Sequence, residues 1–138
     1  MTTEFTIDQS TNTQLGQVYR ACVNAQTADE LMAQIQEPLG DWLDVDVMTL
    51  GLVEAPAVLV ASRCPLTHSF IERVQAHSAR CLEGKCKTTL RPDDIVLQQV
   101  GTVTEVEPID NSTNILWAGA LESTGHMLAV ATFYRQNA

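Results

Sequence analysis

The chain has 138 residues, the usual size of one globular domain and enough to bury a hydrophobic core without disulfides or metals. Hydrophobic residues make up 45% and charged residues 18%, which excludes a disordered chain. The 17 acidic residues against 8 Lys and Arg give a formal net charge of −9. So few cations cannot neutralise many phosphates, and this excludes a broad nucleic-acid surface and contact with an anionic membrane.

The N-terminus carries no targeting signal that we can identify. Residues Met1 to Asp8 lack both the basic and the apolar region of a secretory signal. The longest apolar stretch, Met48 to Ala61, is interrupted by Glu54 and Pro56 and is too short to cross a bilayer. We therefore expect a cytoplasmic protein whose four cysteines are free thiols.

Helical periodicity dominates the first third of the chain. Residues 13–25 place apolar side chains three and four positions apart, on one stripe of a helix: Leu15, Val18, Tyr19, Cys22 and Ala25. A second helix is predicted from Thr27 to Trp42, because Thr27 and Glu30 have the spacing of a capping box. Pro38 is predicted to kink or end this helix, since it donates no N–H.

Extended segments follow. Val45 to Val53 is apolar on both faces, which is typical of a central strand covered on both sides, and Val58 to Val60 forms a hairpin with it. Pro65 to Gly84 is predicted to be helical. Three more strands are predicted at Ile95–Val106 (with a bulge at Gly101), Ile115–Leu121 and Met127–Tyr134. Hairpins with segregated helices indicate an α+β fold.

Several of these segments resemble a GAF domain, the sensory module of bacterial signalling proteins. The helix Thr27–Trp42, followed by Asp44–Glu54 and Pro56–Ser62, resembles the opening of that domain. Its middle section is similar to Pro65–Val74 and Leu90–Ile95, and its closing hairpin to Trp117–Phe133.

The resemblance implies a central antiparallel sheet of about five to six strands, with helices on both faces, in residues 27–138. Residues 1–26 would then form an N-terminal helical segment. The implied function is a non-catalytic sensory or regulatory domain that binds a small ligand, or dimerises, to control an attached output domain. The chain stops at Ala138, just after the last strand, so we expect a fragment of a longer protein. The ligand and any cofactor stay unidentified, because we find neither a cyclic-nucleotide-binding signature nor a Cys-His dipeptide for bilin attachment.

The second half also resembles a hotdog-fold acyl-CoA thioesterase. The segments concerned are Leu90–Pro92 and Ala129–Phe133 with the strands between them. Such enzymes place a carboxylate on or near a long central helix, where it activates water, and Glu72 is the candidate here. The Gly-rich entry to that helix is absent, since Arg63–Thr67 precedes it, so we favour the GAF-like alternative.

Thiols and imidazoles suggest a weak metal hypothesis. Cys64 and His68 are four residues apart, as are His77 and Cys81, with Cys86 just beyond. Residues four apart share a helix face, and thiolate with imidazole can bind zinc. The spacing fits no common zinc motif, so we expect packing roles, an exposed His68, and no metal.

Other reactive groups have simple structural interpretations. We do not expect a redox-sensing thiol; Arg63 beside Cys64 offers the best case for one, because a cation lowers the pKa of a thiol. Asp93 and Asp94 follow Pro92 and are expected in an exposed turn rather than in an acid–base pair. His126 is expected to be exposed in a hairpin turn. The acceptor pattern Asn111-Ser-Thr113 is expected to be only a turn.

Two apolar features suggest binding surfaces. Trp117 and Phe133 alternate with small residues on predicted strands, so either a helix packs on that face or a ligand cavity lies over it; we favour the helix. The stripe on residues 13–25 is close to a heptad seam. We therefore predict a homodimer through the N-terminal helices, which light scattering would test.

Overall fold

The computed structural model describes residues 16, 25–53, 57–83, 91–110 and 112–136. Their order is helix, two strands, helix and three strands, the predicted α+β arrangement. The elements are α2 (Ala28–Leu43), β1 (Val47–Leu52), β2 (Ala57–Ser62), α3 (His68–Leu82), a short 3-10 helix (Pro92–Asp94), β3 (Val96–Val100), β4 (Asn114–Ser123) and β5 (His126–Arg135). Most of the helix expected over residues 13–25 lies outside the described residues, as does Gly84, the last residue of the helix predicted from Pro65.

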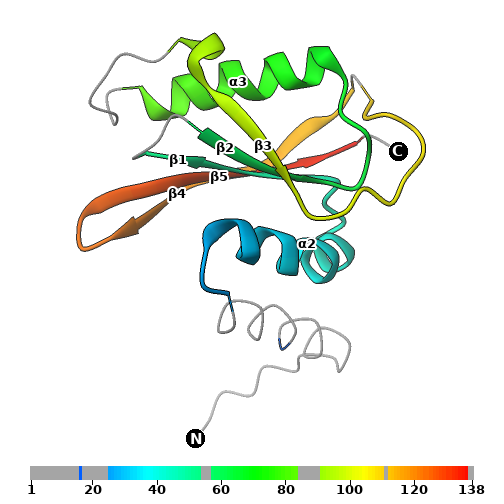
Figure 1. Ribbon diagram of the computed structural model, residues 1–138, viewed down its shortest axis with the longest axis horizontal. Helices are drawn as coiled ribbons and strands as arrows, with labels where there is room; N and C mark the ends of the chain where they lie inside the picture. The colour runs from blue at the N-terminus through cyan, green and yellow to red at the C-terminus, as the bar shows by residue number, and fades with distance from the viewer. Residues whose placement is uncertain (1–15, 17–24, 54–56, 84–90, 111, 137–138) are drawn as a thin grey trace, which may run out of the picture.

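The strands form one open sheet in the order β3-β2-β1-β5-β4 (Figure 1). The pairs β1–β2, β1–β5 and β4–β5 are antiparallel, but β2 and β3 run parallel. The expectation of an antiparallel sheet is therefore wrong at this pair. Its cause is the connection: α3 carries the chain back along the sheet, so β3 starts from the same end as β2.

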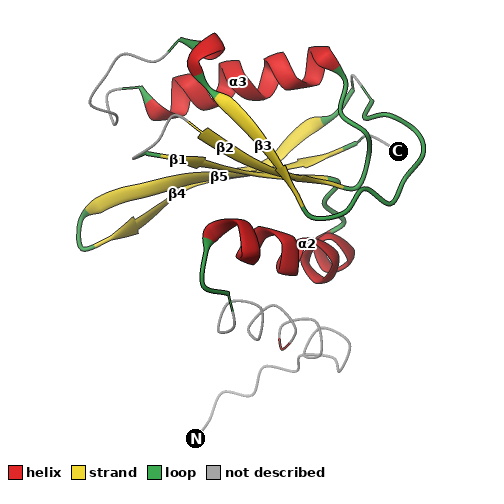
Figure 2. Ribbon diagram, in the orientation of Figure 1, coloured by secondary structure: helices red, strands yellow, loops and turns green. Residues whose placement is uncertain are grey.

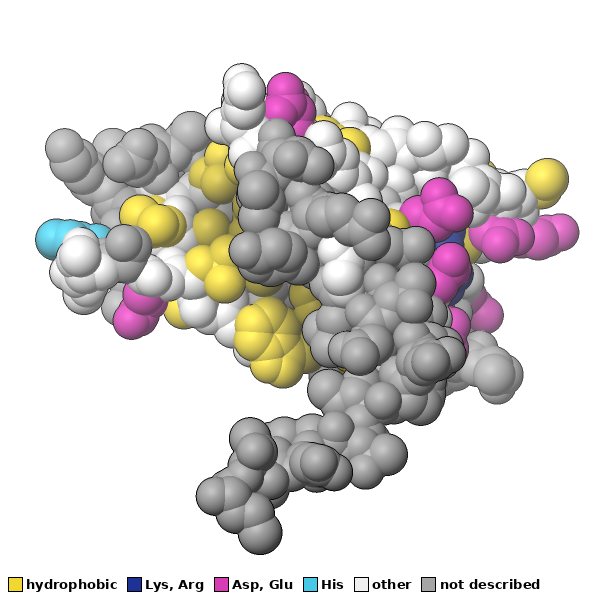
Figure 3. All heavy atoms as spheres, turned by 90° about the horizontal axis from the view of Figure 1, so that it is seen from below, with side chains coloured by type: hydrophobic (Ala, Val, Ile, Leu, Met, Phe, Trp, Pro, Cys, Tyr) yellow, Lys and Arg dark blue, Asp and Glu magenta, His cyan; other side chains and the backbone are white. Residues whose placement is uncertain are grey.

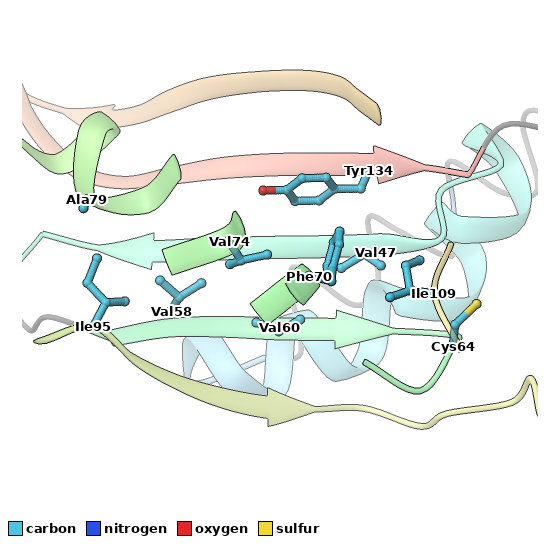
Figure 4. Packing of buried hydrophobic residues seen from close by; sticks show 10 residues of the cluster. All are labelled: Val47, Val58, Val60, Cys64, Phe70, Val74, Ala79, Ile95, Ile109 and Tyr134. Carbon is cyan, nitrogen blue, oxygen red and sulfur yellow. The ribbon is translucent and has the colours of Figure 1, made fainter. Parts of the chain in front are cut away.

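The two helices lie on opposite faces of the sheet (Figure 2). On the α3 side, Phe70 packs edge-on against Tyr134 with ring centroids 5.1 Å apart. Figure 4 shows this cluster of buried side chains, which comprises Val47, Val58, Val60, Cys64, Phe70, Val74, Ala79, Ile95, Ile109 and Tyr134. A second buried cluster lies between α2 and the sheet and includes Met32, Leu39, Met48, Leu50 and Leu59. Helices on both faces differ from a hotdog arrangement, in which a sheet curls around one long helix.

Helix α2 begins as predicted but does not stop at its proline. The Thr27 hydroxyl accepts the N–H of Glu30, and the Glu30 carboxylate accepts the N–H of Gln26. The helix continues through Pro38 to Leu43 and ends where Asp44 adopts a left-handed φ of 54°. Leu39 is buried immediately after the proline, and this packing offsets the missing hydrogen bond.

Strand β3 is shorter than predicted. It ends at Val100, and Gly101 adopts a φ of 75°, which only glycine reaches at little cost. Gly101 therefore ends the strand instead of forming a bulge within it. The last two strands form the expected hairpin, closed by a tight turn in which Thr124 and Gly125 both have positive φ.

Candidate functional site

A cleft of about 340 Å³ lies between helix α2 and the chain that follows β3. Its volume is at the lower end of the range found for small-molecule sites. Charged and polar side chains dominate its lining: Gln36, Glu37, Asp41, Arg63, Thr102, Thr104 and Glu105, with Ala33. Figure 3, which views the α2 face, shows acidic side chains gathered around a basic one at one end of the molecule.

Gln36 fixes one wall of the cleft to the other. Its side-chain amide donates to the carbonyl of Thr102 at 2.9 Å, and its carbonyl accepts the Thr102 N–H at 2.8 Å. Gln36 is a buried polar residue, so this paired contact meets its hydrogen-bonding needs. A Cβ atom on Gly101 would lie 2.0 Å from Gln36 Oε1, and Gly101 therefore allows the two segments to approach.

Arg63 joins three parts of the chain at the floor of the cleft. Its N–H donates to the carbonyl of Asp46, and its own carbonyl accepts the N–H groups of Thr104 and Glu105. These backbone contacts hold residues 104–105 beside the end of β2. Arg63 therefore has a fixed position because both its N–H and its carbonyl are bonded to neighbouring segments.

The Arg63 guanidinium lies among carboxylates. It contacts Asp46 at 3.0 Å, Asp44 at 3.5 Å and Asp41 at 3.7 Å. Its Nε is buried and has no hydrogen-bond partner among the residues that the structure describes. Asp46 also accepts the N–H of Gln136 at 2.7 Å, so the ion pair with Arg63 is anchored to the end of β5.

The balance of charge in the cleft is negative. Among the described residues, Arg63 is the one cation of the lining, and carboxylates already surround it. Glu37 and Glu105 add two further carboxylates to the lining. Such a set of oxygen acceptors attracts an ammonium or guanidinium group and repels an anion.

The structure does not support the redox hypothesis for Cys64. The residue is buried, and burial is the main cause that raises the pKa of its thiol; Asp46 and Glu105 raise it further. Arg63 and a hydrogen bond from Gln136 lower this pKa but do not outweigh the other causes. Arg63 therefore does not activate the thiol, because burial and the neighbouring carboxylates outweigh its charge.

The metal candidates are placed in two separate environments. Cys64 lies in the core, whereas His68 is exposed at the start of α3, as expected, and contacts Glu72 at 2.9 Å. His77 and Cys81 do meet, with the sulfur 3.5 Å from His77 Nε2. No cluster of three metal-binding side chains occurs within the described ranges, and Cys86 lies outside them.

His77 and Cys81 form a half-buried pair between α3 and β5. His77 Nε2 also lies 3.1 Å from the hydroxyl of Thr132. Burial lowers the pKa of His77, with Arg80 and Arg73 adding to the effect, and burial raises the pKa of Cys81. Both shifts favour the neutral forms over a thiolate–imidazolium pair.

The other predicted site residues lie on the surface. Glu72 is exposed on α3, away from the cleft lining. Asp93 and Asp94 form the predicted exposed turn, in which the Asp94 carboxylate accepts the N–H of Arg91. His126 is exposed at the start of β5, as expected, and Asn111 lies outside the described residues.

Trp117 and Phe133 contact each other across β4 and β5, with ring centroids 5.5 Å apart. Trp117 is 48% exposed, so within the described part of the chain no helix covers it as we had favoured. Its ring lies over Gly119, where a Cβ atom would come within 2.4 Å of the indole. The small residue therefore makes room for the tryptophan of the same strand.

Comparisons with known proteins identify no relative. No family model matches the chain, and neither a curated protein nor a solved structure is similar to it. Neither α2 nor α3, the two helices within the described ranges, has the length and apolar character needed to cross a bilayer.

The residues that define the cleft were not singled out as a site from the sequence. Gln36 and Thr102 meet across 66 positions, which no local pattern signals. One clue was available, because Gln36 lies on the apolar side of α2 with Met32 and Leu39. A polar side chain on such a stripe needs a buried partner.

Proposed function

We propose that this chain is a non-catalytic sensory or regulatory domain, GAF-like in organisation, that binds a small organic cation in the cleft between α2 and residues 102–105. The proposed role is to control an output domain attached to it. The cleft is the observation that supports this proposal. Its volume suits a small molecule, and its lining has more carboxylates than cations. The sheet between two helices is compatible with a GAF-like domain.

A ligand held there would contact elements from both halves of the chain. Glu37 lies on α2, and Glu105 follows β3, so one cation can bind to both walls. Regulation requires that the ligand bind one conformation better than another. A cation bridging Glu37 and Glu105 favours the conformation in which α2 and residues 102–105 are close together.

The proposal is tested by thermal unfolding and titration calorimetry with a monoamine, a diamine and a guanidinium salt at constant ionic strength. We expect at least one to raise the melting temperature, since binding to the folded state stabilises it. Glu37→Gln and Glu105→Gln should each weaken that binding by about tenfold, the effect of losing one charge-assisted hydrogen bond. Asp41 is left unchanged because it also pairs with Arg63.

Glu72→Gln is the matched control, because it removes one exposed carboxylate on α3, outside the cleft. It should bind the cation as the unmodified chain does. Equal weakening in Glu72→Gln would mean that the cations respond only to net charge, and the proposal would fail. Hydrolysis of an acyl-CoA that is lost in Glu72→Ala would replace it with the thioesterase alternative.

A further inference from the structure

The open edge of β4 carries an exposed apolar surface that the cleft does not explain. Its large side chains are each between 42% and 50% exposed: Ile115, Leu116, Trp117 and Leu121 on β4, with Leu128 on β5. Strand β4 is the last of the sheet and pairs only with β5 in the described part of the chain. Figure 3 shows hydrophobic side chains open on this half of the α2 face.

Strand β4 has few of the features that prevent an edge strand from pairing with a strand of another chain. Protected edges usually carry lysine or proline, or are short. Strand β4 has ten residues, and neither lysine nor proline is among them. Its register with β5 is regular from Trp117 to Leu121, between two irregularities. A second strand can therefore pair along this stretch.

The sequence of this stretch suits pairing with itself. Leu116-Trp-Ala-Gly-Ala-Leu121 places one alanine on each side of Gly119, and then Trp117 and Leu121. If two copies pair antiparallel around Gly119, alanine faces alanine and each Trp117 faces the partner's Leu121. In such an isologous contact the residues from Trp117 to Leu121 meet small or apolar neighbours, whereas Leu116 faces the partner's Glu122.

Symmetry also puts the large side chains together. Two strands paired antiparallel at a two-fold axis perpendicular to the sheet keep the same faces on the same side. Trp117 lies on the face of Phe133, in the cluster on the α2 side. Both indoles would then lie on one face, close to the glycine of each strand, and shield each other from water.

The exposed apolar area supplies part of what a dimer interface needs, and the charge on β4 itself does not prevent two copies from pairing. The five side chains expose roughly 500 Å² of apolar surface, and a standard interface takes about 800 Å² from each partner, so the backbone edge and the small residues between them need to supply the rest. The chain's charge of −9 opposes dimerisation, but the only charged residue of β4 is Glu122. Its two copies would lie roughly 20 Å apart, beyond the screening length.

We infer that β4 is a homodimerisation edge, through which two copies form one continuous ten-stranded sheet centred on Gly119. This surface is distinct from residues 13–25 and from the cleft. The inference therefore holds or fails independently of the proposed ligand.

Sedimentation and light scattering of the full chain test the inference. We expect a concentration-dependent dimer. Leu121→Lys should raise its dissociation constant at least about tenfold, because each lysine would face an apolar residue of the partner. The matched control is Val96→Lys on the opposite edge strand, β3, where Val96 is 65% exposed. It should leave the dimer unchanged.

Engineered cysteines test the register without relying on a charged variant. Ala118→Cys with Ala120→Cys places two pairs of facing thiols across the axis, at a separation suited to disulfides. Oxidation should give a covalent dimer, whereas Ala118→Cys alone should give far less. A monomer at every concentration would overturn the inference. So would a dimer that Val96→Lys weakens as much as Leu121→Lys, or cross-linking by the single cysteine equal to that of the pair.

Discussion

Strands β1 and β2 and strand β4 are similarly rich in apolar residues, but their side chains differ in burial. Strands β1 and β2 are rich in valine and leucine and are buried along almost their whole length. Strand β4 is also rich in apolar residues, yet most of its side chains are exposed. The difference comes from the helices: α2 contacts β1, β2 and β3, and α3 contacts β3 and β5, but neither makes substantial contact with β4. Hydrophobicity alone therefore does not predict which strand forms the core.

The largest loss of stability is expected in the part of the sheet that the helices cover. Phe70→Ala removes a fully buried ring that contacts Tyr134, and should lower the free energy of unfolding by about 3–5 kcal/mol. Trp117→Ala removes a larger ring that is half exposed, and should cost roughly 1 kcal/mol in the monomer. Urea unfolding at low protein concentration measures both. Equal losses would show that the β4 half is as well packed as the centre.

The contact between Gln36 and Thr102 should have the next largest effect. Gln36→Ala leaves the Thr102 N–H and carbonyl without their partner, at an expected cost of about 2 kcal/mol. Gln34→Ala, on the exposed side of the same helix, is the control and should cost less than about 0.5 kcal/mol. The same urea experiment decides between them; similar losses would mean that helix propensity, and not the contact, is responsible.

Removing the Tyr134 hydroxyl should not lower the free energy of unfolding, in contrast to the substitutions above. Its buried hydroxyl has no hydrogen-bond partner among the described residues, so Tyr134→Phe should be neutral or stabilise the fold by about 1 kcal/mol at neutral pH. Burial raises the pKa of Tyr134 from 10.0 to about 12. Between these values the unfolded chain loses this proton and the folded chain keeps it, so stability falls as the pH rises, by about 1.4 kcal/mol per pH unit.

Tyr134→Phe should remove this alkaline loss of stability. Urea unfolding at pH 8 and again above pH 10 measures the difference between variant and unmodified chain. A loss of the same size in both would assign the alkaline effect to other groups. A marked destabilisation at neutral pH would show that the hydroxyl has a partner, such as a buried water.

The smallest effect is expected on the open edge. Leu121→Ala removes a side chain that is 45% exposed, and should change the stability of the monomer by only about 0.5 kcal/mol. Unfolding measured below the dimer dissociation constant gives this value. A loss of several kcal/mol would mean that Leu121 is covered within the monomer, and the contrast between the two halves would disappear.

Local sequence patterns were sufficient to predict most of the helices and strands, but not how the strands pair in the sheet. The cap at Thr27, the stripe of α3 and the turn at Gly125 are features of neighbouring residues, and these elements lie where the sequence predicts them. The parallel pairing of β2 with β3 depends on where α3 delivers the chain, which no short pattern specifies. The N-terminal dimer helix, the GAF-like identity and the function remain predictions.

The candidate site was harder to predict than the fold, because its residues meet only in three dimensions. In the sequence Arg63 is adjacent to Cys64, and this adjacency offered the best case for an activated thiol, although packing roles were expected for the cysteines. In the structure the guanidinium contacts Asp41 near the end of α2, and Asp44 and Asp46 between α2 and β1. Adjacency in the chain fixes the distance between two backbones, but the charges of other segments decide where a long side chain points.

The parallel ladder between β2 and β3 also constrains the order of folding. Strands β1 and β2 are neighbours in the chain and need only a short loop to pair, whereas β3 reaches β2 after the whole of α3. Closing the longer loop costs more chain entropy, and this loss is recovered only when α3 packs on the sheet. We therefore expect the sheet to grow outward from the β1–β2 hairpin and to add β3 late, as pulse-labelling hydrogen exchange would show by slow protection of the β3 amides.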